Sequence, residues 1–580
     1  MFQATINFKE SIISQKNKEE SSKFHFSSVR LILPYLKEHL KEGLFASIFM
    51  ILLSLLVLPT PYLMKYIVDD VITKKNLSLL NLIILAIIGF QILKLLLSFL
   101  TNYFFNILNQ EVLVKIKKDL FSKLLRLPLS FFDSQQTGYL HSRISEVEGL
   151  GIFFSNYIVR ILIGILEFLF CLWILLYLNW KLTLISLTVI PFLFVATRFY
   201  SRSIRKTSKE VMEKGASLSR KIQESLSGVE VIKSFSSEDR ETTKIHTSLD
   251  ELKQTNIKRN IQFTISSEIL SLIGALGGFI VLWYSGWKII EGTFTIGTYI
   301  AFSAYLAKLY GPTQILATMG LTLQPAITAL NRVTELFELI EERDEGVRIK
   351  EIKGEIEFKD VFFSYDSKKE DVLKSLNLIV KPGEKILIKG PNGSGKSTIV
   401  KLILGLYRTD RGKITIDGRD INTLSLSSLR ERISFVSQNV FLFNDTIWNN
   451  ILYSKPDAKD EKVIESARLA GAYEFIMNLE DGFETVIGET GKKLSGGERK
   501  KLSIARAILK DSDIIIFDEA TSELDLDSQK RIEELITERF KERTCIIISH
   551  RAFGKNSIDR KYTLNDGKVV DTNSKFIRMG

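Results

Sequence analysis

A glycine-rich run carries the clearest chemistry in this chain of 580 residues. It reads Gly390-Pro391-Asn392-Gly393-Ser394-Gly395-Lys396-Ser397-Thr398. Its glycines let backbone N–H groups curl around phosphate oxygens, while Lys396 can reach the terminal phosphates and the Ser397 hydroxyl can bind Mg²⁺. An apolar run, 386–388, precedes it and a helical stretch, 399–406, follows it, which is the strand–loop–helix setting of a P-loop. The sequence therefore predicts a site for a nucleoside triphosphate with Mg²⁺.

Two adjacent carboxylates supply the chemistry that such a site needs. Asp518 and Glu519 follow directly after the apolar run 514–517. On its own, this pattern is equally typical of a buried strand with an acidic turn. Beside a P-loop, Asp518 is suited to hold Mg²⁺ through water, and Glu519 is suited to act as the general base for the water that attacks the γ-phosphate. We therefore predict that the bound triphosphate is hydrolysed.

The composition requires two kinds of region around these residues. Mean hydropathy is +0.11 and 45% of the residues are hydrophobic, yet 25% are charged. An ordinary soluble chain rarely averages a positive hydropathy. The two cysteines, Cys171 and Cys545, form no CxxC pair, which excludes a disulfide scaffold and a cysteine-based zinc site. The net charge of +11 fits nucleic acid, anionic lipid or basic loops beside a membrane.

The first 340 residues carry six predicted membrane spans. Residues 43–64 are 22 residues without a charge, which is long enough to cross a bilayer. The predicted spans are 43–66, 79–105, 155–178, 182–202, 263–287 and 293–318. Buried helices of a large soluble protein are the alternative, and they are excluded because no region of comparable size is available to cover them. Residues 1–25 are polar and have no apolar run of the kind found in a cleaved signal peptide.

Loop charges give the orientation of these spans. Residues 108–155 carry six Lys or Arg residues, and residues 201–260 carry thirteen. The positive-inside rule places these long loops in the cytoplasm, and an even number of spans places both termini there as well. Basic loops of this kind account for much of the net charge without nucleic acid. A short amphipathic stretch, 29–40, is expected to lie along the membrane surface.

After residue 340 the sequence changes in character. Short β-like runs alternate with helical stretches, which is typical of a soluble α/β domain. The fold class is therefore an α-helical polytopic membrane domain with six transmembrane helices, joined to an α/β P-loop NTPase domain. The predicted parts are a cytoplasmic tail (1–27), the transmembrane domain (28–340), a charged linker (341–353) and the ATPase domain (354–580).

Further motifs in the second half resemble those of ATP-binding cassette (ABC) proteins. The signature motif is represented by Leu494-Ser495-Gly496-Gly497-Glu498, and the D-loop by Ser522-Glu523-Leu524-Asp525. Tyr365 resembles the aromatic residue that stacks on adenine, Gln438 the glutamine that contacts Mg²⁺, and His550 the switch histidine. Each of these three residues alone is also compatible with an ordinary structural role. Seven motifs in the family order remove that alternative.

The resemblance implies roles for the residues of the site. Glu519, His550 and Lys396 are the implied catalytic group. ATP and Mg²⁺ are the implied ligands, with Ser397, Gln438 and Asp518 at the metal. ATP binding is implied for the adenine-stacking residue, the P-loop, the glutamine, the signature and the D-loop aspartate, which are Tyr365, Gly390, Pro391, Asn392, Gly393, Ser394, Gly395, Lys396, Ser397, Thr398, Gln438, Ser495, Gly496, Gly497, Glu498 and Asp525.

The first half is similar to the exporter branch of that family. Residues 127–133, with 137–140 and 142–143, resemble its first cytoplasmic loop, and residues 228–235 resemble its second. The resemblance implies that both loops carry short helices that dock into the cassettes. It also implies that two cassettes meet head to tail, with each ATP between the P-loop of one and residues 495–497 of the other. A homodimer is the simplest expectation, and a heterodimer with a degenerate partner stays open.

Three features depart from the family pattern. Glu498 stands where glutamine is usual, Glu523 stands where alanine is usual, and residues 551–554 replace the run that usually follows the switch histidine. The signature glycines and Asp525 are retained. We therefore expect a functional ATPase with an altered dimer interface.

Five charges lie within or near the predicted spans: Lys94, Arg160, Glu167, Glu268 and Lys308. Intramembrane charges are usually functional because leaving them in lipid is costly. Arg160 and Glu268 could instead lie at the inner interface and snorkel to water, and Arg160 and Glu167, two turns apart, could neutralise each other. If the cations face the cavity, an amphipathic cargo with an anionic head, such as a lipid, would fit. The apolar walls would accept a lipid tail or a hydrophobic drug equally well.

The sequence therefore predicts ATP-driven export or flipping of a hydrophobic or amphipathic molecule, a lipid or a drug-like compound. The expected setting is a cell membrane, with membrane lipids around the chain, the ATPase domain in the cytoplasm and no nucleic acid as partner. A peptide exporter is one alternative, and an ATP-gated channel or regulatory subunit is another. A soluble ATPase that handles nucleic acid is opposed by the six spans.

Overall fold

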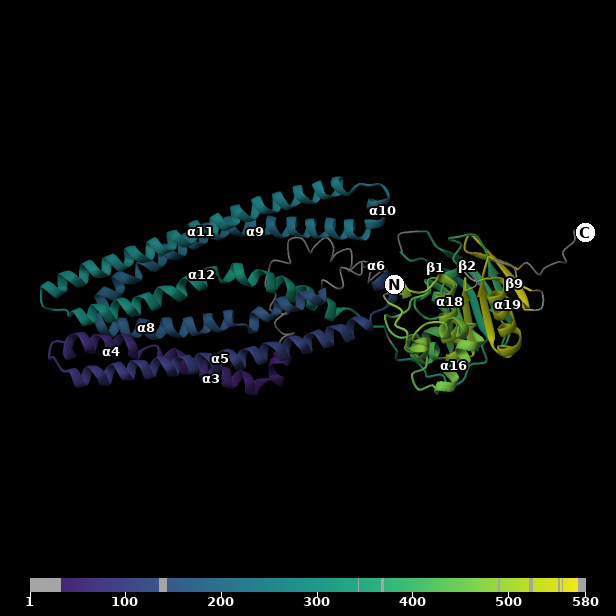
Figure 1. Cartoon of the computed structure of the whole chain (residues 1–580), viewed down its shortest axis with the longest axis horizontal. Coiled ribbons are helices and arrows are strands. Elements are labelled where there is room, and N and C mark those ends of the chain that lie inside the picture. Colours follow the sequence, from purple (N-terminus) through teal and green to yellow (C-terminus); the bar gives the residue numbers. More distant parts are fainter. Residues whose placement is uncertain are drawn as a thin grey trace, which may run out of the picture. The chain divides into compact units, whose positions relative to one another are not determined.

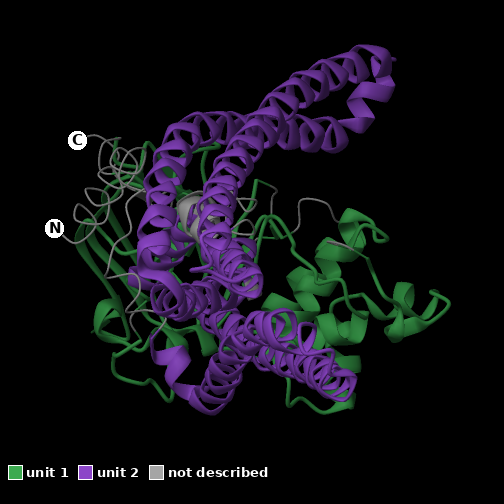
Figure 2. Cartoon of the chain, turned by 90° about the vertical axis from the view of Figure 1, so that its left-hand side faces the viewer, with its two compact units in different colours: residues 1–15, 126–137, 340–580 green, residues 16–125, 138–339 purple. Residues whose placement is uncertain are grey.

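The structure is a computed structural model that divides into two compact units. It describes residues 33–134, 143–342, 344–366, 370–488, 491–520, 525–550, 553–554 and 557–571. One unit is helical and comprises residues 16–125 and 138–339, whereas the other comprises residues 1–15, 126–137 and 340–580 (Figure 2). Outside the described residues lie the predicted N-terminal tail, the first four residues of the amphipathic stretch (29–32), and residues 137–140 and 142 of the first loop.

The helical unit consists of a few very long helices joined by short ones (Figure 1). Its elements are α3 (Leu40–Leu56), α4 (Pro59–Tyr66), η2 (Ile67–Val71), α5 (Leu77–Leu125), η3 (Val147–Phe154), α8 (Asn156–Leu187), α9 (Val189–Ser227), α10 (Val229–Ser234), α11 (Glu238–Ile290) and α12 (Ile296–Glu338). With 49 residues at about 1.5 Å per residue, α5 is about 74 Å long, more than twice the ~30 Å of a bilayer core. Helix α5 therefore continues well beyond the apolar part that a bilayer core could hold.

Four helical stretches among the described residues are long and apolar enough to cross a membrane. They are Leu40–Val71, Leu77–Leu125, Arg143–Ser227 and Glu238–Ile290. The third stretch contains two predicted spans, because the backbone leaves the helical conformation at Asn179 (φ −161°, ψ 101°). The sixth predicted span lies on α12, which is not one of the four. All six predicted spans therefore lie on helices, although length and composition alone single out four stretches.

Polar contacts join α12 to other parts of the helical unit. Its first turn is capped by Asp69 of η2, which accepts hydrogen bonds from the Thr295 hydroxyl (2.6 Å) and the Gly297 N–H (2.9 Å). Further along α12, Tyr305 donates a hydrogen bond to the Leu58 carbonyl, and Tyr310 donates one to the Ser186 carbonyl (2.8 Å). Satisfying hydroxyl and backbone groups inside the unit is required where no water reaches them.

The second unit contains two sheets. An antiparallel sheet has the order β2-β1-β4-β5, and a mainly parallel sheet has the order β10-β9-β3-β8-β7-β6. The strands are β1 (Ile356–Phe363), β2 (Leu373–Val380), β3 (Lys385–Lys389), β4 (Arg411–Ile416), β5 (Arg419–Asp420), β6 (Ile433–Val436), β7 (Ile514–Asp518), β8 (Thr544–Ile548), β9 (Arg560–Asn565) and β10 (Lys568–Asp571). Strands β3, β8 and β7 are neighbours and parallel, so their carboxyl ends meet at one edge of the sheet.

Helices cover these strands and form two apolar clusters with them. One cluster contains residues of both sheets and of α13, and the other contains β7, β8 and α18. The helical elements are α6 (Leu129–Ser134), α13 (Lys396–Ile403), η4 (Ile421–Thr423), α14 (Leu426–Glu431), α15 (Ile447–Leu452), α16 (Asp460–Leu469), α17 (Tyr473–Met477), η5 (Gly482–Glu484), α18 (Gly496–Lys510), α19 (Leu526–Glu534) and η7 (Leu535–Arg539). The predicted α/β fold is present, with α13 directly behind the glycine-rich run.

Candidate nucleotide site and membrane cavity

The glycine-rich run leaves β3 and enters α13, as the sequence predicts. Gly395 caps this helix with φ 101°, a left-handed conformation that disfavours any residue with a side chain. A Cβ atom there would lie 2.8 Å from a methyl carbon of Leu373. Lys396 begins the helix, and its ammonium group donates hydrogen bonds to the carbonyls of Gly390 (2.8 Å) and Pro391 (2.9 Å). The loop thus wraps around the ammonium that would meet the terminal phosphates.

Asp518 ends β7 at the edge where β3 also ends. Its side chain is buried, and this burial raises the pKa of the carboxyl group, while a hydrogen bond from Ser397 and the positive charges of Lys500 and Lys396 lower it. A carboxylate and a hydroxyl in direct contact are oxygen ligands of the kind that Mg²⁺ prefers. The donor set formed by Asp518 and Ser397 therefore fits a magnesium ion bound together with a triphosphate.

Glu519 brings three segments of the chain together. Its backbone is left-handed (φ 51°), which is strained for a residue with a side chain, and its N–H donates a hydrogen bond to the Ile548 carbonyl of β8 (2.9 Å). Its carboxylate accepts a hydrogen bond from the Gln438 side-chain amide (2.9 Å) and lies 3.5 Å from His550 Nε2. Strain of this kind is common at active sites, where it fixes the direction of a side chain.

Most of the predicted site residues line one cavity of about 590 Å³. Its wall contains Tyr365, Val372, Asn392, Gly393, Gly395, Lys396, Ser397, Thr398, Gln438, Glu519 and His550. Tyr365 is half-exposed, and its hydroxyl lies 3.1 Å from Thr398 Oγ1. Elements far apart in the sequence therefore meet around a space of the right order for a small ligand.

Other predicted residues do not line this cavity. Ser495 caps α18, accepting a hydrogen bond from the Glu498 N–H (3.3 Å), and Glu498 Oε2 accepts hydrogen bonds from the Ser495 N–H and hydroxyl (2.8 Å each). Asp525 caps α19, and its carboxylate accepts a hydrogen bond from the Ser528 N–H (2.7 Å). Residues 522–524 of the D-loop and residues 551–552 lie outside the described residues. Ser495 and Asp525 thus cap helices, and neither they nor the signature glycines line the chain's own P-loop cavity.

One buried lysine beside the site was not predicted from the sequence. Lys500 of α18 is only 1% exposed, and its ammonium donates hydrogen bonds to the carbonyls of Ser437 (3.1 Å) and Gln438 (2.7 Å). It therefore fixes the backbone that carries the Gln438 side chain. In the sequence it belongs to a run of basic residues that is typical of a solvated helix face, so the pattern gave no signal.

A second cavity, of about 300 Å³, lies in the helical unit and contains two of the five charges in or near the spans. Apolar residues of α3, α4, α5 and α12 line it together with Lys94 of α5 and Lys308 of α12. Glu167 of α8 is near enough for its carboxylate to attract both ammonium groups. Arg160 and Glu268 do not line this cavity. Among the described residues, neither lysine has a hydrogen bond or salt bridge of its own.

Comparisons with known proteins match both halves of the chain. The model described as "ABC transporter transmembrane region" matches residues 44–313, and the model described as "ABC transporter" matches residues 373–522. An ATP-dependent lipid A-core flippase of Syntrophus aciditrophicus is 32% identical over 544 residues, which are 93% of this chain and 90% of that protein. A Bacillus subtilis protein named for multidrug export is 33% identical over 524 residues, which are 89% of this chain and 90% of that protein.

A solved structure matches almost the whole chain as well. It is that of a bacterial Atm1-family ABC exporter with ATP bound. The TM-score is 0.80 at 26% sequence identity, and the match covers 92% of this chain and 94% of the other. The predicted fold class, a helical membrane domain followed by an α/β ATPase domain, is confirmed by these matches.

Proposed function

The chain belongs to the ABC transporter family and is an integral membrane protein, and we propose that it uses ATP hydrolysis to export or flip an amphipathic molecule with an anionic head group. Lipid A-core flippases and a protein named for multidrug export are among its relatives, so ATP-driven movement of a lipid or drug-like substrate is the activity they support. The observation that carries the head-group chemistry is the membrane cavity with Lys94 and Lys308.

The two lysines support an anionic ligand for an energetic reason. An ammonium group in apolar surroundings is costly, and the single carboxylate of Glu167 can neutralise only one of the two. A phosphate or carboxylate head would balance the second charge, while the apolar residues beside it would accept the start of a hydrocarbon tail. A neutral or cationic drug would leave one positive charge uncompensated.

In the proposed ATPase cycle, the cassette residues divide the work. Tyr365 stacks on adenine, the P-loop N–H groups and Lys396 hold the phosphates, and Ser397, Gln438 and Asp518 would hold Mg²⁺, which supplies charge neutralisation on the phosphates. Glu519 takes a proton from the attacking water, and the contacts from Gln438 and His550 orient its carboxylate. Removing such a base lowers the rate by about 10²- to 10⁴-fold.

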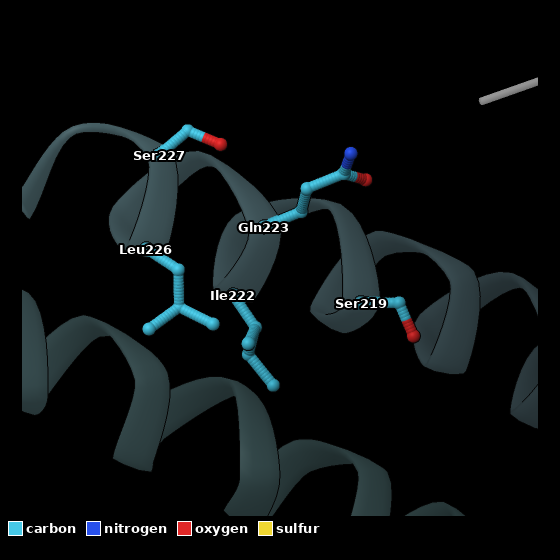
Figure 3. A pocket seen from close by; sticks show the side chains of 5 residues that line it. All are labelled: Ser219, Ile222, Gln223, Leu226 and Ser227. Carbon is cyan, nitrogen blue, oxygen red and sulfur yellow. The ribbon is translucent and has the colours of Figure 1, made fainter. Parts of the chain in front are cut away.

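We further propose a homodimer in which a second cassette completes each site. Ser495 and its glycines do not line the P-loop cavity of their own chain, as expected if they complete the site of a partner. The tip formed by the end of α9 with α10 also leaves apolar side chains exposed, among them Leu226 (70%), Val231 (60%) and Phe235 (77%). Ile222 and Leu226 point toward an adjacent helix at an open hollow there (Figure 3). A partner cassette would cover this tip.

The charge distribution supports a place in the cell membrane with the cassette in the cytoplasm. The thirteen Lys and Arg residues of 201–260 lie mostly on the polar extensions of α9 and α11, which run side by side (Figure 1). Positive charge of this kind is retained on the cytoplasmic side. ATP is then available to the cassette.

The test is ATP hydrolysis by the purified chain in vesicles of phosphatidylcholine alone or with phosphatidylglycerol, with wild type beside Glu519→Gln. We expect Glu519→Gln to lower hydrolysis by at least about 10²-fold. We expect the anionic lipid to stimulate the wild type but not the Lys94→Met/Lys308→Met double variant. Lys181→Met, a lysine outside the cavity, is the matched control. Flipping of a short-chain fluorescent phosphatidylglycerol measures transport directly.

Each outcome bears on a different part of the proposal. Stimulation by cationic drugs alone would overturn the anionic head group and leave the exporter. Hydrolysis without movement of any lipid, drug or peptide would favour the channel or regulatory subunit. An inactive wild-type chain would overturn the homodimer and indicate a related partner chain.

A further inference from the structure

The short helix α6 packs with the α/β domain in one compact unit, although it lies far away in the sequence (Figure 2). Leu129 at its start packs against the apolar cluster that contains β1 and α13. Asp133 near its end is held by two side chains of the domain. The Tyr407 hydroxyl donates a hydrogen bond to Asp133 Oδ2, and the Lys401 ammonium lies 3.4 Å from the same oxygen. The Asp133 carboxylate thus links α6 to two side chains of the domain.

Both partners of Asp133 also contact Tyr365, the proposed adenine platform. The rings of Tyr365 and Tyr407 pack edge to face, with centroids 5.2 Å apart and planes at 86°. The Lys401 ammonium lies 5.2 Å from the centroid of Tyr365 and 5.5 Å from that of Tyr407. Phe363 of β1 supports both rings edge to face. Edge-to-face and cation–π contacts restrict orientation, so movement of one ring is felt by the other.

The two tyrosines differ in exposure, so a change at the exposed ring can be passed to the buried one. Tyr365 is 43% exposed and faces the nucleotide cavity, whereas Tyr407 is only 7% exposed. An exposed ring has freedom that a stacked purine removes, while the buried ring follows its neighbours. Burial, the hydrogen bond to Asp133 and the charge of Asp133 raise the pKa of Tyr407, so its hydroxyl stays a donor at physiological pH.

We propose that Tyr407 is a positioning residue that relays the presence of an adenine ring on Tyr365 to α6 through Asp133. This inference rests on the proposed ATP site and adds a regulation to it: the first cytoplasmic helix responds to the base of the nucleotide, and not only to its phosphates. A ligand shifts a conformational equilibrium only through contacts that differ between the two states. A phosphate chain without a base has no contact with Tyr365 and therefore cannot affect α6 through Tyr407 and Asp133.

The experiment uses the full chain in lipid nanodiscs, with Glu519→Gln to prevent turnover and an environment-sensitive fluorophore on Ser134→Cys. Ser134 is exposed and adjacent to Asp133, while the natural Cys171 and Cys545 are buried and protected from the label. Mg-ATP is compared with Mg-tripolyphosphate at saturating concentrations, which fills the phosphate site without a base. ATP affinity is measured in parallel by equilibrium binding.

We expect ATP to change the fluorescence and tripolyphosphate to leave it nearly unchanged. In Tyr407→Phe, which keeps the ring but removes the hydroxyl, the ATP-dependent change should fall about tenfold, since the lost hydrogen bond is to a charged group. ATP affinity should stay within about twofold, since Tyr407 does not line the cavity. Tyr473→Phe, a half-buried ring elsewhere in the domain, is the matched control and should respond like the parent.

Two results would overturn the relay. One is an equal fluorescence change with tripolyphosphate and ATP, and the other is an undiminished ATP response in Tyr407→Phe. Absence of ATP binding in the parent would instead refute the ATP site on which the inference rests. An Asp133→Asn variant adds a check, because its amide oxygen can still accept the Tyr407 hydrogen bond. This variant should therefore preserve more of the ATP response than Tyr407→Phe does.

Discussion

Replacing the buried Lys500 by methionine tests how the site is held in place. The change removes two hydrogen bonds, to the carbonyls of Ser437 and Gln438, while keeping most of the side-chain volume. Hydrogen bonds to charged groups contribute about 1.5–3 kcal/mol each, and the burial cost of the lysine charge offsets part of this. A net loss of about 1.5–3 kcal/mol in fixing the Gln438 segment is therefore expected.

This loss should appear in the chemical step. Because Gln438 orients the Glu519 carboxylate through a hydrogen bond of 2.9 Å, a misplaced Gln438 segment lowers kcat for ATP hydrolysis by about 10- to 100-fold. KM for ATP should change less than about threefold, because Lys500 does not line the cavity. The assay is steady-state ATP hydrolysis of the full chain in lipid vesicles. Lys381→Met, an exposed lysine in the turn between β2 and β3, away from the carboxyl end of β3, is the control.

This role of Lys500 is refuted if Lys500→Met keeps kcat within about twofold of the wild type, or if KM rises while kcat is unchanged. The first result would mean that the Gln438 segment is held by other contacts. The second would mean that Lys500 acts on nucleotide binding. Thermal unfolding of both variants separates either result from a general loss of folded protein.

Three further changes have expected outcomes. Gly395→Ala should weaken ATP binding at least tenfold, measured by equilibrium binding, because it strains a left-handed position by about 1 kcal/mol and adds a clash at 2.8 Å. Asp69→Ala should speed amide hydrogen exchange in the first turn of α12 about tenfold, since two hydrogen bonds to that turn are lost, and exchange unchanged at Gly297 would contradict the capping role. Glu498→Gln should speed exchange in the first turn of α18 by about two- to fivefold through loss of a favourable charge at a helix N-terminus, and protection equal to the wild type at Glu498 itself would count against it.

The local chemistry of the nucleotide site could be predicted because its motifs are contiguous. A P-loop is one run of residues between a strand and a helix. Its glycines indicate, from the sequence alone, where the backbone adopts conformations that other residues disfavour. The carboxylates at the end of β7 carry a similar local signal. What the sequence pattern did not contain is that β8 lies between β3 and β7, which brings His550 within 3.5 Å of Glu519. Strand order depends on contacts between distant segments. Only the family resemblance predicted that His550 belongs to the same site as Glu519.

Lys500 and Tyr407 show where residue type alone misleads. A lysine is almost always solvated, and a tyrosine after a helix is usually a core residue with a polar tip. Their environment depends on their hydrogen-bond partners. Lys500 contacts two backbone carbonyls, and Tyr407 contacts the carboxylate of Asp133, 274 residues away. Partners so far apart in sequence leave no periodic signal, so neither contact could be derived without the fold.

Whether the intramembrane charges face a cavity could be answered only from the structure. Lys94 and Lys308 lie on different helices, and neither residue alone indicates whether it faces a cavity. Because both line the same cavity, two ammonium groups lie close to one carboxylate, which leaves a positive charge that no described side chain balances. An uncompensated lysine in the membrane domain lowers the stability of the fold unless a ligand neutralises its charge. The cavity therefore supports the anionic head group that we propose for the substrate.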